Sequence, residues 1–129
     1  MTPELLSVED VLELHAVQLE RYGGGAGLRD LALLESAVAQ PHATFDGDLL
    51  HADLFAMAAA YLFHIVSNHP FVDGNKRVGL LSALVFLDLN GVSIASGSES
   101  LYEVTMAVAA GRASKVEVTE VLRRIAETA

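Results

Sequence analysis

One nine-residue segment, residues 69–77, brings together side chains that suit the transfer of a phosphate-containing group. It reads His-Pro-Phe-Val-Asp-Gly-Asn-Lys-Arg. His69 is a base that can be neutral at cytoplasmic pH, and Asp73 is a hard oxygen ligand of the kind that holds Mg²⁺ together with substrate phosphates. Lys76 and Arg77 are two of only eight cations in the chain. In such a set the histidine would take the proton of an attacking hydroxyl, while the metal and the cations would bear the phosphate charge.

The sequence around this segment predicts a helix on either side of a short loop. Pro70 disfavours helical geometry in the residue before it, so the first helix is expected to end at residues 68–69. The second helix is expected to begin near Asn75, and its first turn would direct unpaired N–H groups and the positive end of the helix dipole outward. Gly74 lets the backbone approach a ligand closely. The start of the second helix is therefore a candidate phosphate-binding site.

A structural interpretation of the same residues stays open at this point. Short motifs have many chance matches, and the segment is also typical of a turn. Asp73 or Asn75 could simply cap the second helix, with the two cations solvated. On either interpretation, Phe71 and Val72 are expected to pin the loop to the core.

Two helices without a polar face are expected at the centre of the molecule. They run from about Asp53 to Ser67 and from about Asn75 to Leu89, directly before and after the segment. Helices that are apolar all round belong inside a core. The segment is therefore expected to connect the two central helices of a helical bundle.

The remaining elements are expected to surround this pair. Flanking helices are predicted over residues 8–22 and 31–40, and after Ser98 and Ser114, which look like helix caps. Residues 42–50 predict a surface loop with a short extended excursion, and residues 92–95 a strand fragment. The predicted class is all-α, with a single domain over residues 1–129.

The composition narrows the classes of partner. The chain has 129 residues, is 52% apolar and carries a net charge of −9, which fits one domain with a real core. Eight Lys and Arg against seventeen acids are too few cations to coat nucleic acid. The absence of cysteine excludes disulfides and thiol chemistry. The longest uncharged run, residues 54–72, is polar in its second half, so no membrane span is expected. With no signal-peptide pattern at the start, the cytoplasm is the expected compartment.

The segment resembles the signature of the Fic/Doc superfamily, His-x-Phe-x-(Asp/Glu)-Gly-Asn-(Gly/Lys)-Arg. All seven specified positions match, at His69, Phe71, Asp73, Gly74, Asn75, Lys76 and Arg77. Stretches that resemble the death-on-curing (Doc) branch extend over nearly the whole chain, among them residues 7–12, 22–24, 27–30 and 34–37. The resemblance implies the compact all-α Fic/Doc bundle, with the signature between its two central helices.

The resemblance also implies a role for each signature residue. His69 would be the base that activates the target hydroxyl, Asp73 the Mg²⁺ ligand, Phe71 the buried anchor, Gly74, Asn75 and Lys76 the anion-binding turn, and Arg77 a contact to nucleotide phosphate. In this family the loop after residue 41 forms a flap where the target backbone docks. Thr44, Phe45 and Asp46 could therefore meet the target, although an ordinary surface loop fits them equally well.

Two positions separate this chain from the Fic enzymes that transfer AMP. Those enzymes usually have Gly where Lys76 stands and a second Arg three residues after Arg77, where this chain has Leu80. Both features are similar to the Doc toxins. The resemblance to them implies a protein kinase that uses ATP and Mg²⁺, with the nucleotide reversed so that its γ-phosphate faces the target. The implied target is a threonine of bacterial elongation factor Tu, and the implied outcome is arrested translation.

Regulation by a separate partner is expected. Toxins of this branch are neutralised by a small antitoxin protein whose disordered tail folds on the toxin surface. The inhibitory-helix pattern of some Fic enzymes, (Ser/Thr)-x-x-x-Glu-(Gly/Asn), does not occur in the sequence. Two alternatives to the toxin kinase remain: a Fic-type AMP transferase and a catalytically silent partner-binding module. Lys76 and Leu80 argue against the AMP transferase. The intact His69 and Asp73 argue against the catalytically silent module.

Three other residues receive structural interpretations. His15 lies on the apolar stripe of the first helix and is expected to be a packed or hydrogen-bonded core histidine. Arg29 and Asp30 are expected to form a helix cap and a local ion pair.

Overall fold

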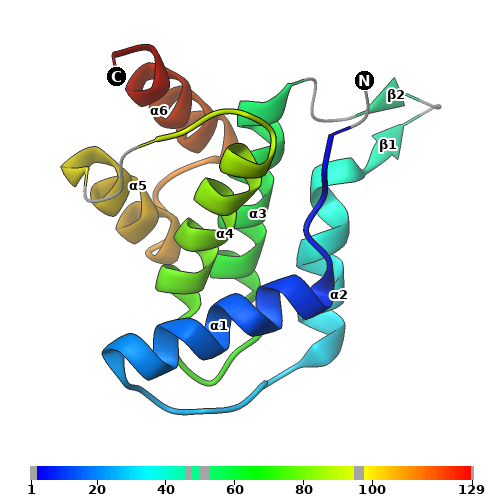
Figure 1. Cartoon of the computed structure of the whole chain (residues 1–129), viewed down its shortest axis with the longest axis vertical. Coiled ribbons are helices and arrows are strands. Elements are labelled where there is room, and N and C mark those ends of the chain that lie inside the picture. The colour runs from blue at the N-terminus through cyan, green and yellow to red at the C-terminus, as the bar shows by residue number, and fades with distance from the viewer. Residues whose placement is uncertain (1–2, 46–47, 50–52, 95–97, 129) are drawn as a thin grey trace.

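Two antiparallel helices at the centre of the molecule carry the segment 69–77 between them (Figure 1). They are α3 (Leu54–Asn68) and α4 (Asn75–Leu89). The computed structural model describes residues 3–45, 48–49, 53–94 and 98–128. Four more helices surround the central pair: α1 (Val8–Tyr22), α2 (Leu31–Ala39), α5 (Glu99–Ala109) and α6 (Lys115–Thr128). The predicted all-α class is confirmed.

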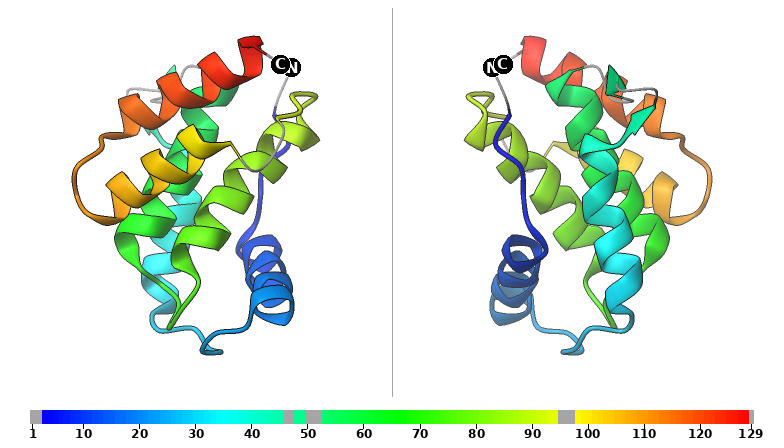
Figure 2. Two further views of the ribbon diagram at one scale, coloured as in Figure 1. Left: turned by 90° about the vertical axis from the view of Figure 1, so that its left-hand side faces the viewer. Right: turned by 90° about the vertical axis from the view of Figure 1, so that its right-hand side faces the viewer.

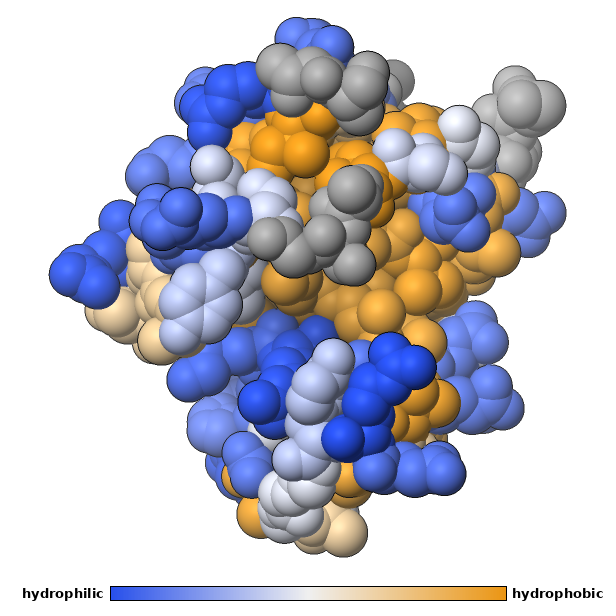
Figure 3. Space-filling model, turned by 60° about the vertical axis from the view of Figure 1, so that its left-hand side comes forward, coloured by the Kyte–Doolittle hydropathy of each residue, from blue (hydrophilic) through white to orange (hydrophobic). Residues whose placement is uncertain are grey.

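The surrounding helices divide between the two sides and one end of the pair. Helices α5 and α6 pack along one side and α2 along the other, while α1 crosses the end that carries the connecting loop (Figures 1 and 2). Figure 3 shows the face that α4 and α5 share, where apolar side chains gather in one area and hydrophilic residues cover the part below it. None of the helices in the described ranges has the length and apolarity needed to span a bilayer.

Helix caps account for several of these boundaries. Asp53 caps α3 by accepting a hydrogen bond of 2.8 Å from the Ala56 N–H. Ser7 and Asp10 form a complete capping box before α1, although the third position holds Asp rather than the usual Glu or Gln. Ser114 forms a second reciprocal cap with Glu117. These local contacts explain why α1, α3 and α6 begin where the sequence predicts. Ser98 precedes α5 as expected, but its side chain makes no capping hydrogen bond.

Of the two short extended segments that the sequence predicts, one is confirmed and the other is wrong. The loop after α2 contains a 3₁₀ turn, Gln40–His42, and two antiparallel two-residue strands, β1 (Thr44–Phe45) and β2 (Asp48–Leu49). This is the extended excursion expected there. The strand fragment expected at residues 92–95 is wrong for residues 92–94, which pair with no strand of the described ranges; residue 95 lies outside them.

A close crossing of α3 and α4 fixes the spacing of the central pair. Gly79 of α4 faces α3, and a Cβ at this position would lie 2.7 Å from Cγ2 of Val66 and 3.3 Å from the Leu62 carbonyl oxygen. About two helical turns further along α4, the buried ring of Phe86 packs against that of Tyr61 of α3 with centroids 5.2 Å apart. Because α3 and α4 touch through a glycine near the ends that the loop joins, those two ends lie close together.

We expect Gly79→Ala to destabilise the protein, although alanine favours helices over glycine by about 1 kcal/mol. The added methyl group would overpack the α3–α4 contact, and overpacking in cores costs roughly 1–3 kcal/mol. The measurement is chemical denaturation, in which the midpoint should fall while the slope stays the same. A midpoint equal to or above that of the unsubstituted protein would contradict the close contact between these helices.

Candidate active site

The backbone of His69 turns its side chain away from α3 and toward the start of α4. His69 follows the last residue of α3 and adopts left-handed dihedrals of φ 53° and ψ 52°, while its N–H still bonds to the Ile65 carbonyl at 3.1 Å. Among the residues that the structure describes, it is the one non-glycine with positive φ. This conformation is costly for a residue with a Cβ. Neighbouring groups must therefore hold it.

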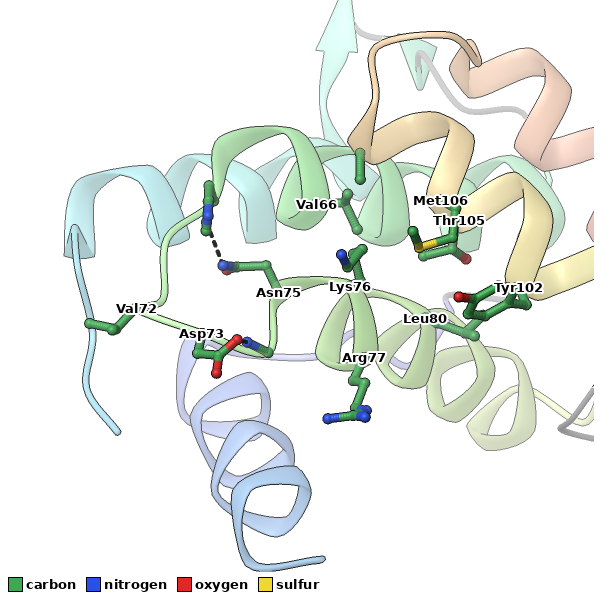
Figure 4. A pocket seen from close by; sticks show the side chains of 13 residues that line it. Val66, Val72, Asp73, Asn75, Lys76, Arg77, Leu80, Tyr102, Thr105 and Met106 are labelled. Carbon is green, nitrogen blue, oxygen red and sulfur yellow. Dashed lines mark hydrogen bonds between the residues drawn. The ribbon is translucent and has the colours of Figure 1, made fainter. Parts of the chain in front are cut away.

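The side chain of Asn75 braces the loop from inside. Its Oδ1 accepts a hydrogen bond of 3.0 Å from the Phe71 N–H, and its Nδ2 donates one of 3.0 Å to the Phe71 carbonyl. These two bonds fix the amide orientation, so the group that meets Nδ1 of His69 is the donor Nδ2 (Figure 4). Because Nδ1 accepts this bond, the neutral imidazole carries its proton on Nε2.

This arrangement changes the part that Asn75 can play in anion binding. Its side chain is 6% exposed and engaged with the loop. Only its backbone N–H, in the first turn of α4, remains for the anion-binding turn implied by the resemblance. Helix α4 begins with Gly74 in a left-handed conformation and has no side-chain cap. The alternative that Asp73 or Asn75 caps α4 is therefore wrong.

His15 and Phe71 anchor the middle of the loop. Phe71 is buried, and the His15 ring stacks on it with centroids 3.8 Å apart and planes 9° apart. His15 Nε2 donates a hydrogen bond of 2.8 Å to the Asp73 carbonyl oxygen. His15 is thus the buried, hydrogen-bonded histidine that was expected. What its place on the apolar stripe of α1 did not reveal is that both of its partners belong to the signature loop.

The segment between α1 and α2 runs along the outside of the loop like a strap. The Val72 N–H bonds to the Gly27 carbonyl at 3.1 Å, and the N–H groups of Arg29 and Asp30 bond to the Pro70 carbonyl at 2.7 and 3.0 Å. Leu28 forms an isolated bridge with Phe71. The strap therefore fixes the outer edge of the loop through its backbone.

Arg29 adds a side-chain contact to this strap. Its Nε donates to the His69 carbonyl at 2.7 Å and its Nη2 to the Asn68 carbonyl at 3.0 Å. A guanidinium suits the negative end of the α3 dipole, and its two contacts hold the backbone of the strained residue. The expected local ion pair is wrong, because Arg29 bonds to these carbonyls, whereas the expected cap is confirmed by Asp30, which accepts from the Leu33 N–H at 3.1 Å.

The Asp73 carboxylate is exposed and held in the ionised form. Its Oδ2 accepts from the Gly25 N–H at 3.2 Å and its Oδ1 from the Gly74 N–H at 2.8 Å. These hydrogen bonds, together with the nearby Arg77, lower the pKa of the Asp73 carboxyl. Gly24 lies so close that a Cβ there would be 2.8 Å from Oδ2. The segment between α1 and α2 thus gives the carboxylate room at Gly24 and one hydrogen-bond donor at Gly25.

These groups open onto a pocket of about 790 Å³ at the start of α4. Its lining includes His69, Asp73, Gly74, Asn75, Lys76 and Arg77. Figure 4 shows Asp73 and Asn75 at one end, Lys76 in the middle and side chains of α5 at the other end. The Arg77 guanidinium lies over the Tyr22 ring, 4.6 Å from its centroid. The structure therefore brings together all six residues assigned to chemistry or phosphate binding.

Of the residues suggested for a target-docking flap, Thr44 and Phe45 have their backbone at the far end of α3 from this pocket. Thr44 and Phe45 form β1 at the N-terminal end of α3, whereas His69 follows its C-terminal end (Figure 1). A helix of 15 residues separates these ends by about 22 Å. Asp46 lies outside the described residues. The docking role of this segment stays a prediction.

Comparison with known proteins identifies the family. The family model described as "Fic/DOC family" matches residues 5–87, which include the strap, the signature loop and most of α4. The chain belongs to the Fic/Doc family. It is 36% identical to "Protein kinase doc" of Escherichia phage P1 over 120 residues, which cover 93% of this chain and 94% of that relative. It is 42% identical to "Toxin Doc" of Mycolicibacterium smegmatis over 93 residues, which cover 72% of this chain and 69% of that relative. The resemblance drawn from the signature is confirmed.

We expect Arg29→Ala to loosen the backbone at the end of α3. Two charge-assisted hydrogen bonds to the Asn68 and His69 carbonyls are lost, and such bonds contribute roughly 1.5 kcal/mol or more. Amide hydrogen exchange in residues 68–72 should accelerate by about tenfold. Arg29→Lys should give an intermediate effect, because an ammonium cannot reproduce the planar fork.

A matched control is Arg124→Ala, which removes an exposed cation from α6, a helix that contributes no residue to the described pocket lining. It should leave exchange in residues 68–72 unchanged. Equal protection of these residues in Arg29→Ala and the unsubstituted protein would contradict the bracing role of Arg29.

Proposed function

We propose that this protein is a Doc-like toxin that transfers the γ-phosphoryl group of ATP to a hydroxyl group of a protein target. The observation that carries the proposal is the gathering of one histidine, one carboxylate and two cations around a single pocket at the start of α4. In the transfer, the hydroxyl oxygen forms a bond to the γ-phosphorus while the bond from that phosphorus to the β–γ bridging oxygen breaks, and ADP leaves. The hydroxyl proton goes to His69.

The hydrogen bond from Asn75 decides how His69 can accept that proton. In the resting ring Nδ1 is the acceptor of this bond, so Nε2 already carries a proton. His69 can take the hydroxyl proton at Nδ1, or at Nε2 after its own proton has moved to Nδ1. Either route requires the Asn75 bond to open. Asn75 therefore positions His69 at rest and releases it when the target hydroxyl arrives.

The phosphates would lie against the start of α4. The first-turn N–H groups of an uncapped helix bind anions, and the helix dipole adds to their effect. Lys76 lines the pocket as a point charge, and Arg77 can contact phosphate with its planar fork. The positive charge of the site is thus concentrated at the start of α4, where the phosphates would bind, although the whole chain has a net charge of −9.

The donor set at Asp73 fits Mg²⁺. Its carboxylate is exposed, and its lowered pKa keeps it ionised. The described residues contain no group of three or more His, Cys, Asp and Glu side chains that could hold a metal on their own. One carboxylate with the remaining ligands from phosphates and water is a typical arrangement for Mg²⁺. When bound there, the ion would offset the negative charge of the phosphates.

Two lining residues favour phosphate transfer over AMP transfer. Lys76 occupies the cradle at a position where the AMP-transferring Fic enzymes usually have glycine. Leu80 lines the pocket one turn later, at the position of their second arginine. The relative named "Protein kinase doc", which covers nearly the whole chain, supports the same choice.

A target and a regulator complete the proposal. The target that follows from the Doc resemblance is a threonine of elongation factor Tu, whose phosphorylation would arrest translation. The relative named "Toxin Doc" supports a toxin and, with it, an antitoxin whose tail folds on the toxin surface. The exposed apolar area in Figure 3 is a surface that an amphipathic segment of such a partner could cover. We also propose that the protein acts in the cytoplasm, where elongation factor Tu is found.

The test follows the label from ATP carrying either an α- or a γ-phosphate label. The protein is incubated with Mg²⁺, labelled ATP and bacterial elongation factor Tu. We expect label to appear on the factor from the γ position only. His69→Ala should reduce the transfer by roughly 100-fold or more, because general-base catalysis contributes about 10²–10⁴-fold.

Each other outcome contradicts a defined part of the proposal. Transfer from the α position would show AMP transfer. Transfer from the γ position to a protein of a bacterial lysate, but not to elongation factor Tu, would overturn the target alone. No transfer to the factor or to a lysate, with equal behaviour of His69→Ala, would leave a partner-binding module.

A further inference from the structure

Tyr22, the last residue of α1, contacts a residue of the pocket from outside the pocket lining. The Arg77 guanidinium lies over its ring, 4.6 Å from the centroid, whereas Tyr22 itself does not line the pocket. In Figure 4, Lys76 and Arg77 leave α4 in different directions, and Arg77 points to the side on which α1 lies. The Tyr22 hydroxyl makes no hydrogen bond with any residue that the structure describes. The contact is therefore made by the face of the ring alone.

A second charged group stands close to Arg77, and Arg77 does not pair with it. Opposite charges four positions apart along a helix commonly pair, and Asp73 and Arg77 have this spacing at the start of α4. Both lie in the part of the chain that the structure describes, yet they form no ion pair. The Asp73 carboxylate accepts instead from the N–H groups of Gly25 and Gly74. The two charges are thus held apart, each by a different contact.

Stacking on Tyr22 leaves the hydrogen-bonding groups of Arg77 free. A guanidinium meets an aromatic ring with its flat face, whereas its N–H donors lie along its edge. None of these donors bonds to another of the described residues. A pair with Asp73 would use the same edge, and it would also occupy the carboxylate. The ring of Tyr22 therefore fixes the direction of the guanidinium without using the donors that a phosphate needs.

We propose that Tyr22 is a positioning residue for phosphate transfer, which holds the Arg77 guanidinium away from the Asp73 carboxylate. Arg77 then stays available to phosphate and Asp73 to the metal ion. The inference rests on the proposed function, from which it takes the roles of these two residues. One short segment, residues 22–25, contacts both groups, because Tyr22 holds the guanidinium and the Gly25 N–H bonds to the carboxylate. Without the ring, we expect the guanidinium to turn to Asp73 and neutralise both groups.

The resting contact is tested by the ¹H–¹⁵N signal of the Arg77 Nε–H group, assigned with Arg77→Ala and recorded at slightly acidic pH, where its exchange with water is slow. Protons over the face of an aromatic ring resonate upfield, so this signal should lie upfield. Tyr22→Phe should keep the shift, and Tyr22→Leu should abolish it. The control Val17→Ala changes another exposed side chain of α1, 49% exposed against 56% for Tyr22, and should leave the signal in place. A signal that Tyr22→Leu does not move would overturn the inference.

Calorimetry with magnesium tripolyphosphate tests the consequence, because this probe offers phosphates and a metal ion without a nucleoside. We expect Tyr22→Leu to weaken binding by roughly threefold, as for the loss of one exposed cation–π contact. Tyr22→Phe and Val17→Ala should bind as the unsubstituted protein does. Arg77→Ala should weaken binding further than Tyr22→Leu. Adding Tyr22→Leu to Arg77→Ala should cause no further loss, because Tyr22 acts through Arg77.

The other outcomes separate this inference from the proposed function. A loss in the double variant beyond that of Arg77→Ala, equal to the loss in Tyr22→Leu alone, would overturn the positioning role in favour of a structural one. Full affinity in Tyr22→Leu, or an equal loss in Tyr22→Phe, would overturn the inference alone. No binding by the unsubstituted protein, or full affinity in Arg77→Ala, would overturn the phosphate site of the proposed function as well.

Discussion

The hydrogen bonds of one side chain, Asn75, hold the geometry of the site together. The amide closes the loop by pairing with both backbone groups of Phe71, and the same amide contacts the imidazole of His69. A buried amide in the first turn of α4 thus ties the end of α3 to the start of α4 across six residues. Leaving these buried groups without partners would cost free energy, so the positions of the histidine and of the uncapped helix start depend on one another.

The rest of the molecule supports this connection from three directions. The glycine contact at Gly79 sets the distance between α3 and α4, and the stacked pair of His15 and Phe71 supports the loop from below. The strap that includes Arg29 holds its outer edge. The backbone of the signature loop is therefore held from several sides, and its left-handed histidine is tolerated because several elements share the cost of holding it.

The sequence could predict a large part of this structure because the relevant signals are local. Apolar helices, cap residues such as Asp53, and a proline between two helices determine element type and order with little help from distant contacts. The contacts that could not be predicted join residues far apart in the chain. His15 was understood as a core residue, but it lies 58 positions from its partner Asp73. Arg29 was expected to form an ion pair, yet it bonds to carbonyls about 40 residues away. Neither separation follows a helical or strand period. In each case the acceptor is a backbone carbonyl, which every residue has, so the sequence does not single it out.

The most direct test of this account is the tautomer of His69, measured by long-range ¹H–¹⁵N correlation on protein labelled at its five histidines, with His69→Ala to assign the signal. The measurement is made at a pH where the ring is neutral. The account predicts a proton on Nε2 and none on Nδ1, because Nδ1 accepts the hydrogen bond from Asn75. In Asn75→Ala this preference should weaken toward a mixture of tautomers. A neutral ring with its proton on Nδ1, or a tautomer that Asn75→Ala leaves unchanged, would contradict the claim that Asn75 holds His69.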